Sequence, residues 1–370
     1  MTTMFSELSK QHLMTALGRM AMVIPGKSPK DVLMSVLLEF GDGYLTMSGT
    51  DLTKAMTIKI PCESPVLAKS LTNFVNLKTM ISRFTGKDIS IGLEKKEILL
   101  SDGQSKFKVP TESNVSEFPR PMWHSDSDVR HTIAIEASDL IDRIAHVMHA
   151  ADPKGTKFAA SSVCLIDSGG QLRIICLDGR RISFSDIPKA SSGVSEITAL
   201  IPVEAARSMI EIFRGIEGTM KLYITESSVY IYTETIDFCC RQNEGRLPRI
   251  TNYLKEAASV EMHLLSGFQL YNMAKQASCV CEEEKFGIDM KGQDGQLSLY
   301  IKTAKGEFDA KLSCDSTMDF TVSAWFLMDA LSKAPPECEV SIGCTGTAGR
   351  LVIKKVIGEL EVTDIIQGMG

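Results

Sequence analysis

The chain has 370 residues, of which 44% are hydrophobic and 23% are charged. At roughly 100 to 200 residues per domain this length predicts two to four domains, and the ordinary composition excludes wholesale disorder. The net charge of −6 argues against a protein that is cationic over its whole surface, such as a general nucleic-acid coat.

The apolar runs are too short to span a bilayer, and the first residues lack the basic-then-apolar order of a signal peptide. The 10 cysteines include no C-x-x-C pair, which argues against a zinc site or a redox motif. We therefore expect a cytoplasmic protein with reduced thiols and no membrane partner.

One order of elements occurs three times along the chain. A helix is predicted over 6–22, 136–151 and 263–278, and each is followed by two strands around a turn glycine, Gly43, Gly170 or Gly295. A second helix is predicted over 70–84, 203–215 and 323–334, and alternating strands follow each one. Because Pro119 and Pro248 end two of the repeats, the sequence predicts three α+β modules, 1–126, 127–253 and 254–370.

The exposed sides of the predicted helices carry basic side chains although the chain as a whole is acidic. Any one of them has an ordinary explanation, because Lys and Arg are common on solvated helices. Their recurrence on equivalent surfaces favours a sequence-independent contact with phosphates, and no aromatic platform or recognition helix indicates base reading. These residues are Lys69, Arg83, Arg143, Arg207, Arg214, Lys275 and Lys333.

The candidates for catalysis are weak. Asp51 and Asp178 follow equivalent strands, which favours turn-capping carboxylates over an acid/base pair. His146 and His149 are spaced to begin a metal site, but no neighbouring ligand completes it, so a solvated or phosphate-facing pair is favoured. Cysteines such as Cys164 lie in apolar strands, as core residues do. We predict no enzyme, no cofactor and no metal.

Several short strings, in order and in register over the whole chain, resemble the bacterial DNA polymerase III beta subunit, the sliding-clamp family. The strings are Ser48-Gly-Thr-Asp-Leu, Asp102-Gly-Gln-Ser-Lys-Phe, Glu117-Phe-Pro, Leu177-Asp-Gly-Arg-Arg-Ile and Gly245-Arg-Leu-Pro. The resemblance implies antiparallel sheets outside and two helices per module inside a ring. The ring is a head-to-tail homodimer that encircles duplex DNA without sequence preference.

The resemblance also implies functional residues. Lys27 and Lys154 match loop positions that touch DNA. A pocket between modules two and three would accept short linear motifs from DNA polymerase, the clamp loader and repair proteins. Its lining would be Lys157, Phe158, Ala159, Ala160, Leu177, Gly179, Arg180, Arg181, Ile182, Pro248, Asn252, Tyr253, Ser323, Phe326, Ile365 and Ile366.

The seam between the two copies would use Phe107 and Val109 on one side, and Val280 and Cys281 on the other. Two features depart from the family pattern: Arg180 stands where the family often has His, and the chain ends in Ile365-Ile-Gln-Gly-Met-Gly rather than in a Met-Pro-Met-Arg pattern. The alternative function is a diverged, non-enzymatic scaffold that keeps the fold and binds protein motifs without encircling DNA.

Overall fold

A computed structural model describes residues 6–63, 67–94, 96–112, 115–120, 123–155, 159–167, 170–188, 197–281, 287–346 and 349–369. The chain divides into two compact units. Unit 1 comprises residues 1–137 and 207–242, and unit 2 comprises residues 138–206 and 243–370. Each unit is described by itself.

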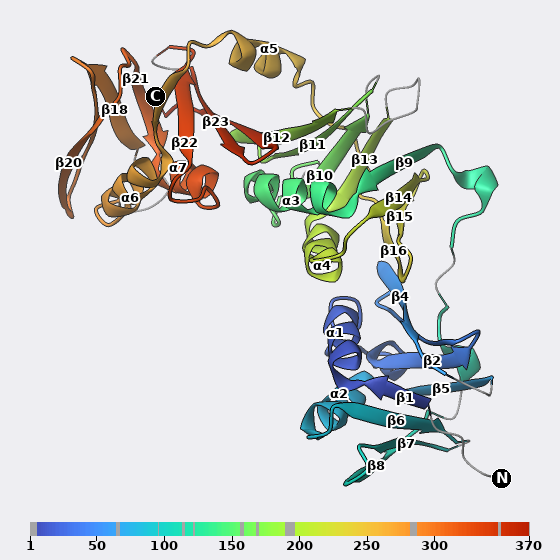
Figure 1. Ribbon diagram of the computed structural model, residues 1–370. Coiled ribbons are helices and arrows are strands. Elements are labelled where there is room, and N and C mark those ends of the chain that lie inside the picture. Colours follow the sequence, from blue (N-terminus) through green and yellow to red (C-terminus); the bar gives the residue numbers. More distant parts are fainter. Residues whose placement is uncertain are drawn as a thin grey trace. The chain divides into compact units, whose positions relative to one another are not determined.

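The order β-α-β-β-β-β-α-β-β-β occurs three times, which confirms the predicted α+β class (Figure 1). The first repeat consists of β1 Ser6–Ser9, α1 Lys10–Met20, β2 Ser35–Gly41, β3 Tyr44–Thr50, β4 Lys54–Pro61, β5 Ala68–Asn73, α2 Phe74–Arg83, β6 Asp88–Leu93, β7 Glu97–Ser101 and β8 Lys106–Pro110. Short 3-10 helices are η1 Asp31–Met34, η2 Val115–Glu117, η3 Asp126–Asp128 and η4 Met148–Ala150.

The second repeat consists of β9 His131–Glu136, α3 Ala137–Val147, β10 Ser162–Asp167, β11 Gln171–Leu177, β12 Arg181–Pro188, β13 Ile197–Pro202, α4 Val203–Phe213, β14 Thr219–Ile224, β15 Ser228–Tyr232 and β16 Ile236–Arg241. The third consists of β17 His263–Ser266, α6 Gly267–Ser278, β18 Gly287–Gln293, β19 Gln296–Thr303, β20 Gly306–Ser313, β21 Asp319–Ser323, α7 Ala324–Leu331, β22 Glu339–Cys344, β23 Arg350–Ile357 and β24 Leu360–Gln367. Helix α5, Thr251–Ser259, lies between these two repeats and was not predicted.

The helices begin later than the sequence predicts. Residues 6–9, 70–73 and 263–266 are strand rather than helix, because each helix starts directly after a short strand. Asn73 and Ser266 cap the helices that follow: their side chains accept hydrogen bonds from the N–H groups of Asn76 (3.0 Å) and Gln269 (3.3 Å).

The predicted hairpin turns are confirmed. Gly43, Gly170 and Gly295 have φ of +79°, +103° and +73°, a region that glycine adopts without strain. Asp42 and Asp294 also have positive φ, as expected of the first central residue of a type I′ turn.

Each unit contains one eight-stranded and one four-stranded antiparallel sheet. In unit 1 the strand orders are β5-β2-β3-β4-β16-β15-β14-β9 and β1-β6-β7-β8. In unit 2 they are β13-β10-β11-β12-β24-β23-β22-β17 and β20-β19-β18-β21. Each large sheet therefore joins four strands of one repeat to four strands of the next, at the β4–β16 pair and at the β12–β24 pair.

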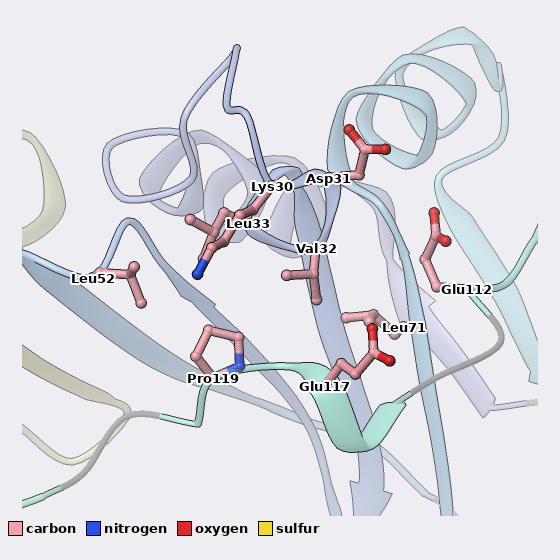
Figure 2. Close-up of a pocket in the computed structure, with 9 residues that line it drawn as sticks. All are labelled: Lys30, Asp31, Val32, Leu33, Leu52, Leu71, Glu112, Glu117 and Pro119. Carbon is pink, nitrogen blue, oxygen red and sulfur yellow. The ribbon is translucent and has the colours of Figure 1, made fainter.

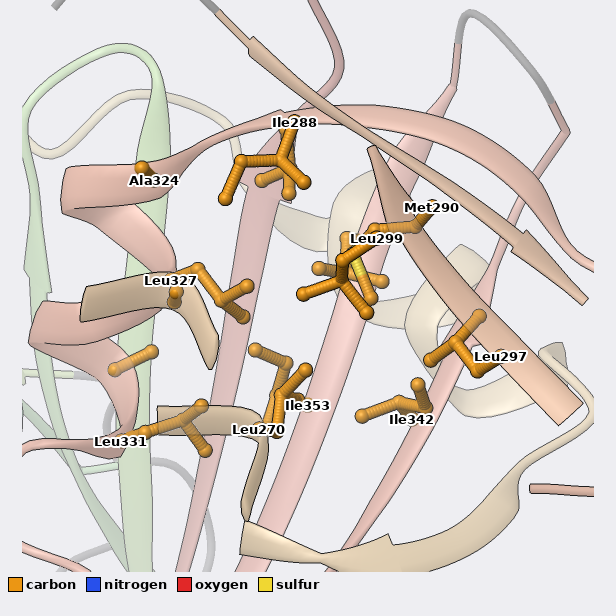
Figure 3. Close-up of a cluster of buried hydrophobic side chains, with 14 of the residues drawn as sticks. Leu270, Ile288, Met290, Leu297, Leu299, Ala324, Leu327, Leu331, Ile342 and Ile353 are labelled. Atoms are coloured by element: carbon orange, nitrogen blue, oxygen red, sulfur yellow. The ribbon is translucent and has the colours of Figure 1, made fainter. Parts of the chain in front are cut away.

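The core of the third repeat fills the space between its strands and the helices α6 and α7. Figure 3 shows side chains from both helices, such as Leu270 and Leu327, meeting strand residues such as Ile288, Leu299 and Ile353. All five are fully buried, and burial of this kind contributes about 1.5–3 kcal/mol per large side chain. The sides of α6 and α7 that pack in this core are therefore not available for other contacts.

The three-module boundaries stay a prediction. The boundary at 126/127 falls inside η3, between β8 and β9, and the boundary at 253/254 falls inside α5. In the described part of the chain, no helix is long and apolar enough to cross a membrane.

Candidate functional sites

Most of the predicted phosphate-facing cations are exposed. The exposed ones on helices, at helix ends or in loops are Lys27, Arg83, Lys154, Arg207, Arg214, Lys275 and Lys333. Lys69 is also exposed, but it lies on β5 and forms an ion pair with Glu39 at 3.0 Å, so its prediction as a helix residue is wrong.

Arg143 is the clear exception. It is only 5% exposed, and its Nη1 donates to the Asp139 carboxylate at 2.8 Å. The expectation that Arg143 lies on a solvent-facing surface is wrong, because α3 is buried around more of its circumference than the Leu140–Ile144–Val147 stripe suggested. Ala137 and Ile141 are buried as well.

The exposed face of α4 is not uniformly basic. Glu204, Arg207, Glu211 and Arg214 follow one another three or four residues apart, and all four are exposed. Arg214 donates to Glu211 at 2.7 Å. Because exposed pairs of this kind offset each other's charge, α4 presents nearly neutral charge to a phosphate.

The two turn aspartates are capping residues, as predicted. Asp178 Oδ1 accepts hydrogen bonds from the N–H groups of Arg180 (2.8 Å) and Arg181 (3.0 Å). Asp51 Oδ1 accepts from Thr53 and Lys54, both at 2.8 Å. Burial of Asp51 acts to raise its pKa, but the hydrogen bonds from Thr53 and Lys54 outweigh it and lower that pKa.

An apolar patch forms where α5 packs against the sheet at the β12–β24 pair. Tyr253, Leu254 and Ile182 are partly buried and pack against a buried cluster that includes Ile365, and Ile365 pairs with Ile182 across the strands. Ile182 and Tyr253 also contact the cluster that contains Leu177. Four of the predicted pocket residues, Leu177, Ile182, Tyr253 and Ile365, therefore lie together.

Arginines flank this patch. The Arg350 guanidinium lies 4.4 Å from the ring centre of Tyr253, and Arg181 lies at the same distance from the ring of Phe326. Arg181 also bridges Asp178 at 2.8 Å and Asp329 at 2.6 Å. These contacts hold two aromatic rings and their cations in fixed places.

The structure corrects one part of the predicted pocket. Ile366 is 1% exposed and belongs to the core of the third repeat, with Leu351 and Phe320, so it does not form one wall with Ile365. Adjacent residues of a strand point to opposite faces, which explains the separation.

The remaining predicted pocket residues lie around the same strands. Ser323, Ala159 and Ala160 are buried, whereas Arg180, Pro248 and Asn252 are exposed. Lys157 and Phe158 lie outside the described residues.

A buried charge cluster at the same strand pair is not predicted by the sequence. Asp364 on β24 is 1% exposed and lies 3.1 Å from Lys355 Nζ and 3.0 Å from His149 Nε2. Burial alone would raise the pKa of Asp364, but Lys355 and His149 hold that pKa below its usual range. His149 is therefore neither solvated nor free to face phosphate, and its Nδ1 lies 2.9 Å from the His146 carbonyl oxygen. Only the i, i+3 spacing of the two histidines hinted at this cluster.

No group of three or more metal-ligating side chains occurs among the residues that the structure describes. Burial raises the pKa of the Cys164 thiol to about 12, and burial also raises the pKa of Cys176 well above its ordinary value. Both thiols stay protonated at neutral pH, as core cysteines do.

The predicted seam residues lie at or beside two sheet edges. Phe107 and Val109 are on β8, where Phe107 packs edge-on against Phe84 at 5.1 Å and Val109 is 1% exposed. Val280 accepts a hydrogen bond from Thr303 at 2.6 Å, and Cys281 is 6% exposed. Val280 and Cys281 thus lie next to the turn that leads into β20.

Comparison with known proteins shows what this chain is similar to. Residues 4–121 match the family model described as DNA polymerase III beta subunit, N-terminal domain. The beta sliding clamp of Treponema pallidum is 23% identical over 345 residues, which are 90% of this chain and 91% of that protein. The beta sliding clamp of Escherichia coli K12 is 20% identical over 343 residues, 90% of each chain.

Solved structures agree on the fold. The sliding clamp (DNA polymerase III subunit beta) from Pseudomonas aeruginosa, bound to griselimycin, superposes with a TM-score of 0.90 at 16% identity and full coverage of both chains. The beta subunit from Thermotoga maritima gives 0.86 at 16% identity, with 99% and 100% covered. The chain thus has the sliding-clamp fold throughout. Its residues 4–121 match the model of the DNA polymerase III beta subunit N-terminal domain, and the predicted resemblance is confirmed.

Proposed function

We propose that the protein is a DNA sliding clamp: a non-enzymatic processivity factor of the cytoplasm that encircles duplex DNA as a head-to-tail homodimer. It tethers DNA polymerase, the clamp loader and repair proteins through short linear motifs. The observation that carries the proposal is that β8 in the first repeat and β20 in the third are edge strands. Their equivalents in the neighbouring repeats are paired with each other.

The repeat supplies the pairing rule. The fourth strand of one repeat pairs with the last strand of the next: β4 with β16, and β12 with β24. By the same rule β20, the fourth strand of the third repeat, should pair with the last strand of a following repeat. Likewise β8, the last strand of the first repeat, should pair with the fourth strand of a preceding repeat. In the described part of the chain, β20 and β8 are instead edge strands. If two copies join head to tail, β8 of each copy pairs with β20 of the other, and the two copies close a ring.

The two edges have opposite charge. Lys106 and Lys108 are exposed on β8, whereas β20 exposes Glu307 and Asp309 with one lysine, Lys311. Within the single chain Lys108 pairs with Glu97 at 2.6 Å, and Glu307 pairs with Lys302 at 3.0 Å. Partly exposed Phe107 and Phe308 on the same strands supply apolar contact. Opposite charges favour β8–β20 pairing over pairing of either strand with its own copy.

The cations on the helices fit a clamp that holds DNA loosely. Exposed Arg83, Lys275 and Lys333 offer attraction to phosphates that is nearly uniform along a duplex. The acidic neighbours on α4 limit that attraction, which favours sliding. Retention then depends on ring closure rather than on affinity.

The apolar patch of Leu177, Ile182, Tyr253 and Ile365 is the proposed motif-binding site. It offers the partly exposed side chains of Ile182 and Tyr253 above the buried Leu177 and Ile365, beside the turn at Gly179, whose φ is +93°. The flanking Arg181 pairs with Asp178 and Asp329, and Arg350 pairs with Glu256, so the two guanidinium groups suit a peptide that carries a polar group next to its apolar anchors.

A charge exchange tests the dimer. Sedimentation velocity of the wild type should show a dimer at micromolar concentration. The variant K106E/K108E should be largely monomeric, and adding E307K/D309K to it should restore the dimer. A wild-type monomer, or a failure of the four-fold exchange to restore association, would contradict the proposed seam.

The scaffold alternative makes a different prediction. A protein that only binds motifs needs no closed ring, so dimer disruption would leave its interactions intact. Loss of DNA retention together with the dimer therefore separates the two functions.

A further inference from the structure

A second groove lies in the first repeat, at the counterpart of the proposed motif-binding site. Its cavity of about 470 Å³ is lined by Lys30, Asp31, Val32, Leu33, Leu52, Leu71, Glu112, Glu117 and Pro119 (Figure 2). The volume is in the range of sites that take one or two anchoring side chains. Every lining residue belongs to unit 1.

The internal repeat relates the two sites residue by residue. Leu37 pairs with Leu71, and Cys164, which is 127 positions after Leu37, pairs with Leu200. The same offset of 127 takes Val32 and Leu33 to Ala159 and Ala160, which were predicted to line the motif-binding pocket.

The correspondence extends to the turn and the joint. The same offset takes Leu52 to Gly179, and Pro119 of Glu117-Phe-Pro matches Pro248 of Arg246-Leu-Pro. The turns are built alike: both Asp51 and Asp178 accept two backbone N–H groups, and Leu52 has a φ of +74° where Gly179 has +93°. The groove is therefore a repeat of the motif-binding position.

The first groove keeps an apolar wall. Leu52 is 46% exposed although it holds a backbone conformation that side chains disfavour. Val32 is partly exposed, and Leu71 packs with Phe118 and Leu37 behind it. The wall can therefore hold an aliphatic or aromatic side chain against Leu52 and Val32.

The rim of the first groove is acidic. Asp31, Glu112 and Glu117 are exposed around the first groove, against a single Lys30. Figure 2 shows the three carboxylates on one side and Leu52, Lys30 and Pro119 on the other. No ion pair joins Asp31 or Glu112 to another described residue. At the motif-binding position, Arg246 stands in place of Glu117.

We propose that this groove binds an extended segment of a partner protein that carries an apolar anchor side chain flanked by Lys or Arg. The anchor lies against Leu52 and Val32, and the basic residues meet Asp31, Glu112 and Glu117. One copy of the chain thus offers two peptide sites at equivalent positions of the repeat, of which the first has an acidic rim. The proposal does not depend on ring closure.

Fluorescence anisotropy with two labelled octapeptides tests it. One carries Leu-Phe flanked by lysines, and its twin has glutamates in place of the lysines. The lysine peptide should bind, and D31K/E112K should weaken its binding about tenfold. E234K, which changes an exposed carboxylate elsewhere in unit 1, should have at most a twofold effect.

The variant Y253D separates this groove from the proposed motif-binding site. It should leave binding of the lysine peptide unchanged. The proposal is overturned if the glutamate twin binds as tightly, if D31K/E112K and E234K weaken binding equally, or if Y253D abolishes binding while D31K/E112K does not.

Discussion

The two places where one repeat joins the next have the same register and different chemistry. At the β4–β16 pair, Met56 faces Phe238, which is fully buried and packs edge-on against Phe213 at 6.1 Å. At the β12–β24 pair, the equivalent positions are Ser183 and Asp364.

The second joint therefore relies on a buried charge. Asp364 is stabilised by Lys355 and His149 rather than by apolar neighbours. A repeat can thus keep its backbone pairing while it replaces hydrophobic burial by an ion pair, provided every buried charge has a partner. The consequence is a joint in unit 2 that is sensitive to charge removal and to acid.

Removing the charge at Asp364 should have the largest effect. D364N leaves Lys355 buried without its counter-ion, and we expect a loss of about 3–5 kcal/mol in the unfolding free energy of unit 2. F238L, the matched change at the other joint, should cost about 1 kcal/mol. Urea denaturation followed by circular dichroism measures both, and D364L/K355M should recover most of the loss. Equal costs for D364N and F238L would contradict the charged-joint account.

Charge placed in the apolar patch should have the next largest effect. Y253D puts a carboxylate among Ile182, Leu254 and Ile365, and should weaken binding of an apolar motif peptide about 100-fold, or about 3 kcal/mol. Fluorescence anisotropy measures the affinity, and sedimentation should show the dimer unchanged. Unchanged peptide affinity would remove the patch from the proposed site.

Exchanging the turn residues sharpens the comparison of the two grooves. G179L should destabilise unit 2 by about 1–2 kcal/mol, because φ at this position is +93°. L52G should stabilise unit 1 by up to about 1 kcal/mol by relieving the same strain. Thermal unfolding of the two variants gives both values, and shifts of the same sign would refute the equivalence of the turns.

Acid should weaken unit 2 through His146. Burial first, and then Lys355 and Lys333, lower the pKa of His146 to about 4. Between pH 6.5 and 4 the unfolded chain therefore binds more protons at this site, and stability falls as the pH falls. Because His146 is partly exposed, we expect about 1 kcal/mol. H146Q should flatten the decline in unfolding free energy over this range, whereas H12Q, a change on exposed α1, should not.

The repeat and its turns could be predicted because they depend on local signals. Gly43, Gly170 and Gly295 mark hairpins by their own backbone freedom, and the alternating strands mark a half-buried sheet. The predicted helices begin too early at Ser70 and His263, because both residues lie in short strands. Over only a few residues, hydrophobic periodicity does not distinguish a strand from a helix.

Burial that depends on distant strands could not be predicted. Arg143 was assigned to solvent from the stripe on its own helix, and Ile366 was assigned to the pocket without its strand register. The His149–Asp364–Lys355 cluster unites residues more than 200 positions apart. The proposed motif-binding site follows from the resemblance, and only the structure shows that Leu177, Ile182, Tyr253 and Ile365 lie together.

Retention on closed DNA tests the central claim most directly. The protein is loaded onto a nicked plasmid with a clamp loader, passed through a gel-filtration column, and measured again after a restriction enzyme linearises the circle. A closed ring predicts that the protein stays on the circle at moderate salt and leaves once the circle is cut. Equal retention on circular and linear DNA would contradict encirclement and favour a scaffold.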